Sequence, residues 1–207
     1  MAKSKEDTAF YRWNRFIGVN EVGSDPNIIG INQDDFHGFS RALAADWPTA
    51  MTTLSTHDTK RSEDVRARLA VLTEYPREWE QCVNELRTAT AESRPVLLDG
   101  GTELFLWQTL AATWTLPGTA AGAEVISADR LTKYLTKAIR EAKLHTSWTT
   151  PDEAYEEAVL EFATACLANP EVAAALDAFT ELTFQSVRAN VLGQKLIQLT
   201  MPGVPDL

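Results

Sequence analysis

The sequence contains one concentrated group of reactive side chains, the pair His57 and Asp58, followed closely by Lys60 and Arg61. A β-branched and apolar run precedes the pair, and a charged stretch with helical spacing follows it. A strand that ends in an imidazole and a carboxylate presents reactive groups at its carboxyl end. Barrel and doubly wound enzymes carry their active sites at that edge. We therefore expect a short strand over residues 50–56 with a candidate site directly after it.

One interpretation of this pair is metal binding. A His-Asp dyad in a helical protein is typical of HD-type phosphohydrolases, in which a Lys often follows, as Lys60 does here. Such enzymes need further ligands on other helices. Only His37 and His145 are available, and neither lies on a helix with convincing ligand spacing. The Thr-rich residues before His57 also differ from the Leu-rich helix that this dyad usually ends.

Two other interpretations need no metal. In the structural one, His57 is a core histidine and Asp58 caps the following helix, although this leaves the density of polar groups unexplained. In the third, the pair belongs to a carbohydrate site, where a carboxylate stabilises an oxocarbenium-like transition state and the His donates to a sugar hydroxyl. A retaining glycosidase also needs a nucleophile and an acid. Asp58 is then a third, supporting carboxylate.

The composition excludes several classes of protein. The 207 residues include 44% hydrophobic residues and six Trp, which is enough for a packed core and argues against disorder. The formal net charge of −10 argues against a nucleic-acid surface, because phosphate binding requires a basic face. The N-terminal residues lack the apolar segment of a secretory signal. We expect a cytoplasmic protein with neither a nucleic-acid nor a membrane partner.

Two features of the composition have a plain structural explanation. The uncharged stretch 104–123 contains Gln108, Pro117 and several Gly and Thr residues, so it predicts a buried core helix that ends near Pro117 rather than a membrane span. Cys82 and Cys166 lie far apart without a CxxC motif. We expect both to be small buried hydrophobic residues.

Hydrophobic spacing predicts that nearly the whole chain is helical. The expected helices cover residues 6–20, 33–45, a segment from 59 onward, a segment opened by Pro76, 102–116, 128–145 capped by Ser127, a segment opened by the capping box of Thr150 with Pro151 and ending near 167, and a long one begun by Asn169 and Pro170. Besides 50–56, only residues 196–201 could form a strand, and they could equally finish the last helix. Two isolated strands make no stable sheet. Either the chain is all helical or the other strands lie outside it.

Several segments together resemble the maltooligosyltrehalose synthase family. They are the N-terminal AKSKEDTAFYRWNR (2–15), NEVGSDP (20–26), MTTLSTHDTKRSEDVRARL (51–69) and LTMPGVPDL (199–207), the last of which is similar to the eighth-strand motif of α-amylase relatives generally. The resemblance implies an α-amylase-type (β/α)8 barrel and an isomerase of trehalose biosynthesis. This intramolecular transglucosylase converts the reducing-end α-1,4 linkage of a maltooligosaccharide into an α,α-1,1 linkage. It implies no metal or organic cofactor for the chemistry.

The resemblance also assigns roles around the His-Asp pair. Asp58 corresponds to the aspartate that stabilises the transition state, and His57 to the sugar-binding histidine beside it. Lys60 and Arg61 match a basic pair implied to bind the reducing-end sugars. The nucleophilic Asp and the acid/base Glu belong to earlier strand motifs that this chain lacks. We therefore expect the chain alone to be inactive on maltooligosaccharides.

A second motif of the family lies in the N-terminal helix. Glu6, Asp7, Tyr11 and Arg12 match a segment near the active-site cleft of the family. Of these, Tyr11 and Arg12 are expected to contact substrate, while the individual roles within the motif stay open.

The spacing of the motifs predicts the domain organisation. About 140 residues, nearly all of helical pattern, separate Asp58 from the C-terminal motif, whereas a barrel crossover takes a few tens. The fold class expected is mainly α, a helical insertion subdomain (59–195) between the seventh and eighth strands of a barrel. Short barrel stubs flank it, a barrel-associated segment (1–58) and a strand-eight stub (196–207). The expected partners are a maltooligosaccharide and the remainder of the barrel, and exposed apolar residues near both ends could make the chain oligomerise.

Overall fold

The computed structural model describes residues 2–115 and 125–206 and is mainly α, as predicted. The helices are α1 (Ala2–Arg12), a 3-10 turn η1 (Ile17–Val19), α2 (Gln33–Asp46), α3 (Glu63–Glu74), α4 (Pro76–Ala89), α5 (Gly100–Thr113), α6 (Ala128–Ala142), α7 (Glu153–Ala168) and α8 (Pro170–Thr200). Two short strands, β1 (Met51–Thr52) and β2 (Val204–Pro205), complete the described elements.

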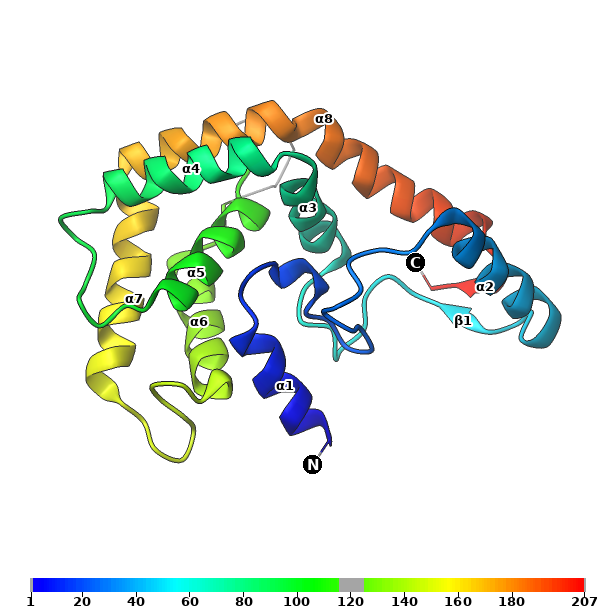
Figure 1. The fold of residues 1–207 in the computed structure, drawn as a ribbon, viewed down its shortest axis with the longest axis horizontal. Coiled ribbons are helices and arrows are strands. Elements are labelled where there is room, and N and C mark those ends of the chain that lie inside the picture. Colours follow the sequence, from blue (N-terminus) through cyan, green and yellow to red (C-terminus); the bar gives the residue numbers. More distant parts are fainter. Residues whose placement is uncertain (1, 116–124, 207) are drawn as a thin grey trace.

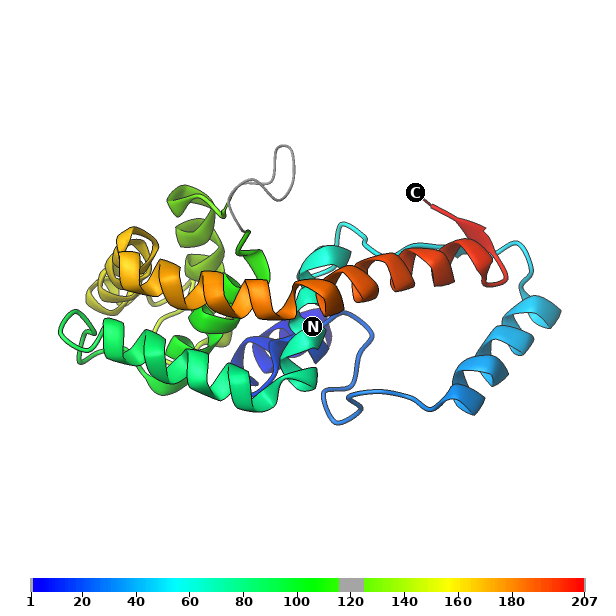
Figure 2. The same ribbon diagram turned by 90° about the horizontal axis from the view of Figure 1, so that it is seen from above.

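The helices form two parts of different character. A helical body contains α1, α3–α7 and the first half of α8, and an arm contains residues 22–52 and 190–206 (Figure 1). Seen from above, α8 runs from the body into the arm and joins the two (Figure 2). The 31 residues of this one helix explain why the molecule is long rather than round.

The core of the body is built around α5. Trp107 and Leu110 are fully buried, because α5 is apolar on nearly every side and packs against both α3 and α8. This confirms the predicted core helix, although Pro117 lies outside the described residues. In the described part of the chain no single helix is long and apolar enough to cross a membrane; α7 and α8 pass that test only together, bent by 70° at their junction.

The two cysteines lie in this core. Cys82 on α4 and Cys166 on α7 are 3% and 1% exposed, and both are free thiols. Burial raises the pKa of each thiol to about 12. Their prediction as small buried hydrophobic residues is confirmed.

Two helix starts follow the predicted caps. The side chains of Ser127 and Asn169 accept from backbone N–H groups of α6 and α8. The predicted cap of α7 was wrong by two residues, because Asp152 rather than Thr150 is the N-cap and Pro151 precedes the helix. A carboxylate interacts favourably with a helix N-terminus, which explains why Asp152 takes this position.

The first helix is shorter than predicted. It ends at Arg12 instead of residue 20, and η1 follows after a break. The amide of Asn20 donates to the carbonyls of Phe10 and Trp13, at 2.8 and 2.5 Å, and so folds the chain back onto the end of α1. These tertiary hydrogen bonds replace the helix that the local spacing favoured.

The two strands are far apart in sequence but pair in parallel, with Met51 opposite Val204. Of the two alternatives left open for residues 196–201, the structure has the helical one, because α8 continues to Thr200 and β2 follows a turn. Gly203 makes that turn with φ of +124°, and a Cβ there would lie 2.8 Å from the carbonyl oxygen of Ala50. Parallel pairing is the relation that neighbouring barrel strands require. Strands of two residues make no barrel, so the barrel stubs stay a prediction.

Candidate functional site

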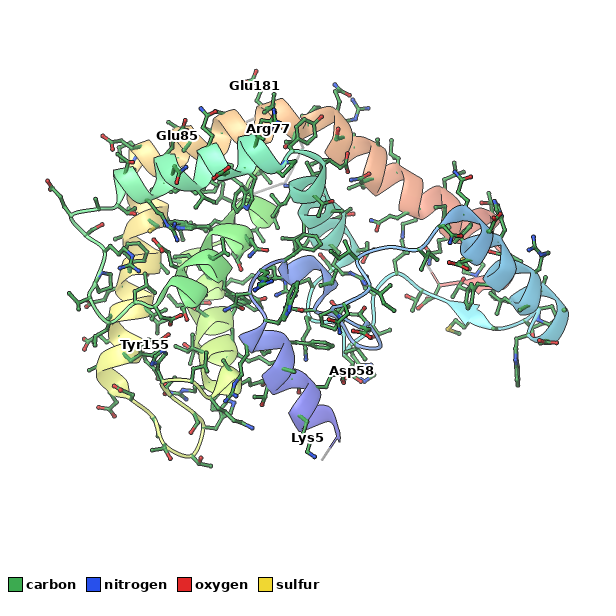
Figure 3. The ribbon with its side chains drawn as sticks, viewed as in Figure 1. Lys5, Asp58, Arg77, Glu85, Tyr155 and Glu181 are labelled. Carbon is green, nitrogen blue, oxygen red and sulfur yellow. The ribbon has the colours of Figure 1, made fainter. Side chains whose placement is uncertain are left out.

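The His-Asp pair lies in an exposed turn between β1 and α3. The turn is closed by Thr59, whose backbone N–H and hydroxyl both donate to the carbonyl of Thr56, at 3.2 and 2.8 Å. The side chain of His57 is 92% exposed and that of Asp58 is 40% exposed, with Nε2 of His57 3.4 Å from Oδ2 of Asp58. Figure 3 shows Asp58 at the edge of the body, beside α1 and facing the side on which the arm extends. Both groups are therefore open to a ligand.

This exposure excludes the purely structural interpretation of the pair. His57 is no core residue, and the N-cap position of α3 belongs to Ser62 rather than to Asp58. The metal interpretation lacks ligands as well, because the described residues contain no group of three or more His, Cys, Asp or Glu side chains that could hold a metal ion. His37 packs against Phe36 on α2, within the arm.

Lys60 follows the pair but points into the protein. Its side chain is 5% exposed and forms an ion pair with Asp7 of α1. The ammonium also lies 5.6 Å from the ring centre of Tyr11, one turn further along α1. Lys60 therefore anchors the turn to α1.

Arg61 is buried as well, at 8% exposure. One terminal nitrogen of its guanidinium donates to the carbonyls of Ile17 and Asn20, at 3.1 and 3.3 Å. The guanidinium lies 5.8 Å from the ring centre of Phe105 on α5. A single side chain thus joins the start of α3, η1 and the core helix.

The two predicted residues of α1 also have protein partners. Tyr11 is 5% exposed and packs edge-on against Phe105, and burial raises the pKa of its hydroxyl well above the ordinary value. Arg12 donates from Nε to the carbonyl of Ala142 at 2.7 Å and from Nη2 to that of Lys143 at 3.0 Å. These carbonyls end α6, where a cation is favourable because the helix dipole is negative there.

Of the six predicted site residues, His57 and Asp58 are open and the side chains of Tyr11, Arg12, Lys60 and Arg61 are engaged within the protein. The structure brings Tyr11, Lys60 and Arg61 together behind the pair and directs Arg12 towards α6. Substrate contacts for these four residues stay a prediction. An exposed carboxylate next to an imidazole can stabilise positive charge and bind hydroxyl groups.

One residue of this region, Glu21, has a role that the sequence did not indicate. The residue is 4% exposed, and its carboxylate accepts from the backbone N–H of Lys60 at 2.6 Å and of Arg61 at 3.2 Å. An acidic residue in a loop rich in Gly, Asp and Pro is ordinarily solvated. The local sequence therefore carried no sign of this burial.

A second polar cluster lies elsewhere, at the start of α5. Asp99 caps this helix and accepts from the hydroxyls of Thr102 and Tyr155, at 2.7 and 2.9 Å, and His145 lies 3.4 Å from it. Burial raises the pKa of Asp99, but the hydrogen bonds from Thr102 and Tyr155 outweigh it and lower the pKa overall. Figure 3 labels Tyr155 on the opposite side of the body from Asp58. Helix capping accounts for this cluster.

Comparisons with known proteins give the resemblance a firm basis. No family model matches the chain. Over 206 residues, all of this chain and 26% of each relative, it is 39% identical to proteins from two strains of Mycobacterium tuberculosis described as candidate maltooligosyl trehalose synthases. Among solved structures, the maltooligosyltrehalose synthase of Arthrobacter ramosus is 38% identical with a TM-score of 0.85, over the whole chain and 25% of that enzyme.

A more distant structure agrees with these relatives. A hypothetical maltooligosyl trehalose synthase of Sulfolobus tokodaii is 32% identical with a TM-score of 0.86, over the whole chain and 28% of that protein. The chain therefore spans about a quarter of the length of the proteins that it matches. The resemblance to maltooligosyltrehalose synthases is confirmed along the entire chain.

Proposed function

We propose that this chain is the part of a maltooligosyltrehalose synthase that supplies the stabilising aspartate, Asp58, and the sugar-binding histidine, His57. The observation that supports this most directly is the similarity over the whole chain to such enzymes, in sequence and in fold. The exposed His57–Asp58 turn, which follows a strand that pairs in parallel, supports this role. The substrate is a maltooligosaccharide.

The proposed reaction moves one linkage within a single substrate. A carboxylate nucleophile from the rest of the protein attacks the anomeric carbon next to the reducing-end glucose. The bond from that carbon to O4 breaks, and a glutamic acid donates its proton to O4. The freed glucose then turns, and its anomeric hydroxyl attacks the anomeric carbon of the glycosyl-enzyme. The bond from that carbon to the nucleophile breaks and releases the carboxylate, while the glutamate takes up the hydroxyl proton. The product has an α,α-1,1 linkage, and no water is consumed.

Asp58 acts in both steps of this scheme. The anomeric carbon gains positive charge as each bond breaks, and a fixed carboxylate nearby stabilises that charge more than it stabilises the ground state. His57, beside it, donates a hydrogen bond to a hydroxyl of the same sugar. The turn is held in place on its buried side by Lys60, Arg61 and Tyr11. Any contact of these residues with the reducing-end glucose adds to that role.

The helical body and the arm have different tasks in this proposal. Residues 59–195 form an insertion beside the active site, where they help exclude the water that would divert the glycosyl-enzyme to hydrolysis. The arm packs against the remainder of the barrel. Its large exposed apolar side chains support this, among them Ile28, Ile29, Phe39, Trp47 and Leu196.

The test uses the longer protein that contains this chain, incubated with maltopentaose. We expect wild type to form the trehalosyl product and Asp58→Asn to lose at least about a hundredfold in kcat, as for loss of a transition-state contact. Asp129→Asn, which removes a carboxylate exposed on α6 and paired with Lys133, should keep wild-type kcat. No trehalosyl product from wild type, or an active Asp58→Asn variant, would refute the proposal. The 207-residue chain alone should form no product.

A further inference from the structure

Two loops distant in sequence lock each other beside the candidate site. The carboxylate of Glu21 accepts from the backbone N–H groups of Lys60 and Arg61, at 2.6 and 3.2 Å. In return, the guanidinium of Arg61 donates to the carbonyls of Ile17 and Asn20. Each loop thus satisfies the polar backbone of the other, across about 40 residues of sequence.

The loop that carries Glu21 is itself held firmly. Glu21 is 4% exposed and also accepts from the N–H of Val22 at 3.0 Å, so its carboxylate has three donors in the absence of solvent. Asn20, 1% exposed, ties the same loop to the end of α1 through the carbonyls of Phe10 and Trp13. Glu21 therefore connects the turn by hydrogen bonds to a loop that is itself fixed to the helical body.

The turn is also braced from its N-terminal side, where the hydroxyl of Ser55 accepts from the N–H of Glu63 at 3.0 Å. Within the turn, the backbone N–H of Asp58 and the hydroxyl of Thr59 donate to Thr56, and the apex is exposed to solvent. Lys60, the first residue after the turn, is anchored through its backbone by Glu21 and through its side chain by Asp7. The position of Asp58, two residues earlier, depends on these anchors.

We propose that Glu21 is a positioning residue of the active site, which fixes the backbone at Lys60 and Arg61 and so holds Asp58 at the reacting anomeric carbon. This rests on the function proposed above. A displacement of about 1 Å in a reacting group can cost about a hundredfold in rate. Glu21 is too deeply buried to contact the sugar itself, so its effect on catalysis passes through the turn.

Three variants of the longer protein test this role. In Glu21→Gln the amide can accept from one N–H but presents its own NH2 group to the other. Glu21→Asp keeps the charge but is one methylene shorter. The matched control is Glu103→Gln, which changes another buried carboxylate, 2% exposed and bound by Arg87 and Arg94 far from the turn. All three variants disturb hydrogen bonds to a buried carboxylate, but only the Glu21 variants change the hydrogen bonds between the two loops.

The first readout is hydrogen exchange of the peptide that covers residues 55–62, followed by mass spectrometry. We expect exchange at least tenfold faster in Glu21→Gln and unchanged in Glu103→Gln. The second readout is steady-state kinetics. For Glu21→Gln we expect kcat to fall between tenfold and about a hundredfold, with KM within threefold of wild type. The kcat of Glu21→Asp should lie between those of wild type and Glu21→Gln. Glu103→Gln should keep wild-type kcat.

Three outcomes would overturn the proposal. They are wild-type exchange in Glu21→Gln, equal losses of kcat in Glu21→Gln and Glu103→Gln, and a rise in KM without a fall in kcat. If Glu21→Gln fails to fold, Glu21→Asp decides by the same criteria. If the wild-type protein forms no trehalosyl product, the proposed function is rejected, and the catalytic role of Glu21 with it. The exchange rates would still show whether Glu21 holds the turn in place.

Discussion

At the scale of single residues, the surroundings of each charged side chain decide its role more than its type does. Lys60 and Arg61 are both cations beside the candidate site, yet one is paired with Asp7 and the other with two backbone carbonyls. A buried charge must be satisfied by such partners, because desolvation is costly. Their first task is therefore to hold the turn that leaves His57 and Asp58 exposed.

The same view gives a testable role to Arg12. Arg12→Ala removes two hydrogen bonds to the last carbonyls of α6, so we expect the free energy of unfolding to fall by about 1–2 kcal/mol. Urea unfolding of the chain measures this, with the exposed Arg15→Ala as a control that should change stability by less than about 0.5 kcal/mol. In the longer protein KM should stay at the wild-type value. A raised KM with unchanged stability would instead assign Arg12 to substrate binding.

The sequence predicted the open half of the site better than the buried half. His57 and Asp58 stand out because a motif and a strand end coincide there. The burial of Lys60 and Glu21 depends on partners that lie about 40 to 50 residues away in sequence. No local pattern encodes such a distant pairing, so a resemblance could name the basic pair but not the acid that holds it.

At the scale of secondary-structure elements, helices were predictable and their ends were not. Apolar spacing, together with start signals such as Ser127 and Asn169, located α4, α6, α7 and α8, because each of these helices has a buried face. The ends depend on competing hydrogen bonds. Asn20 shortens the first helix, and α3 begins at Glu63 rather than at Thr59, which is held in the turn.

The connection between α6 and α7 gives a prediction about pH. Glu156 accepts a bidentate pair of hydrogen bonds from Arg140, at 2.8 and 2.6 Å, and another from Thr146. The hydrogen bonds from Arg140, and then those from Thr146, hold the pKa of this carboxyl below its ordinary value of 4.5. A lowered pKa in the folded state means that Glu156 stabilises the fold above pH 4.5. This contribution is lost as the pH falls through the folded-state value.

Glu156→Gln should therefore be less stable than wild type at pH 7, and the difference should shrink at pH 3. Urea unfolding at the two pH values measures this. Glu157→Gln is the matched control, because its carboxylate lies next in sequence but is exposed on α7. It should show no such convergence. A constant difference between wild type and Glu156→Gln would show that the pair contributes no pH dependence.

At the scale of the whole molecule, the body and the arm differ in what holds them together. The body has a continuous core, centred on α5 and shared by α1 and α3–α8. In the arm, α2 contains no buried residue, and β1 and β2 are two residues each. The proteins that match this chain are about four times as long. The arm therefore has the character of a segment that needs the rest of such a protein to cover it.

This difference predicts how the chain exchanges its amide protons. A helix of 14 residues without a packed face is marginal in water, so in the chain alone α2 should be frayed. We expect its amides to exchange at least about a hundredfold faster than those of α5, which open only with the core. In the longer protein the α2 amides should become protected, because the barrel would cover the arm, whereas the α5 amides should change little. Hydrogen exchange with mass spectrometry measures both samples. Strong protection of α2 in the chain alone would show that the arm folds without the barrel.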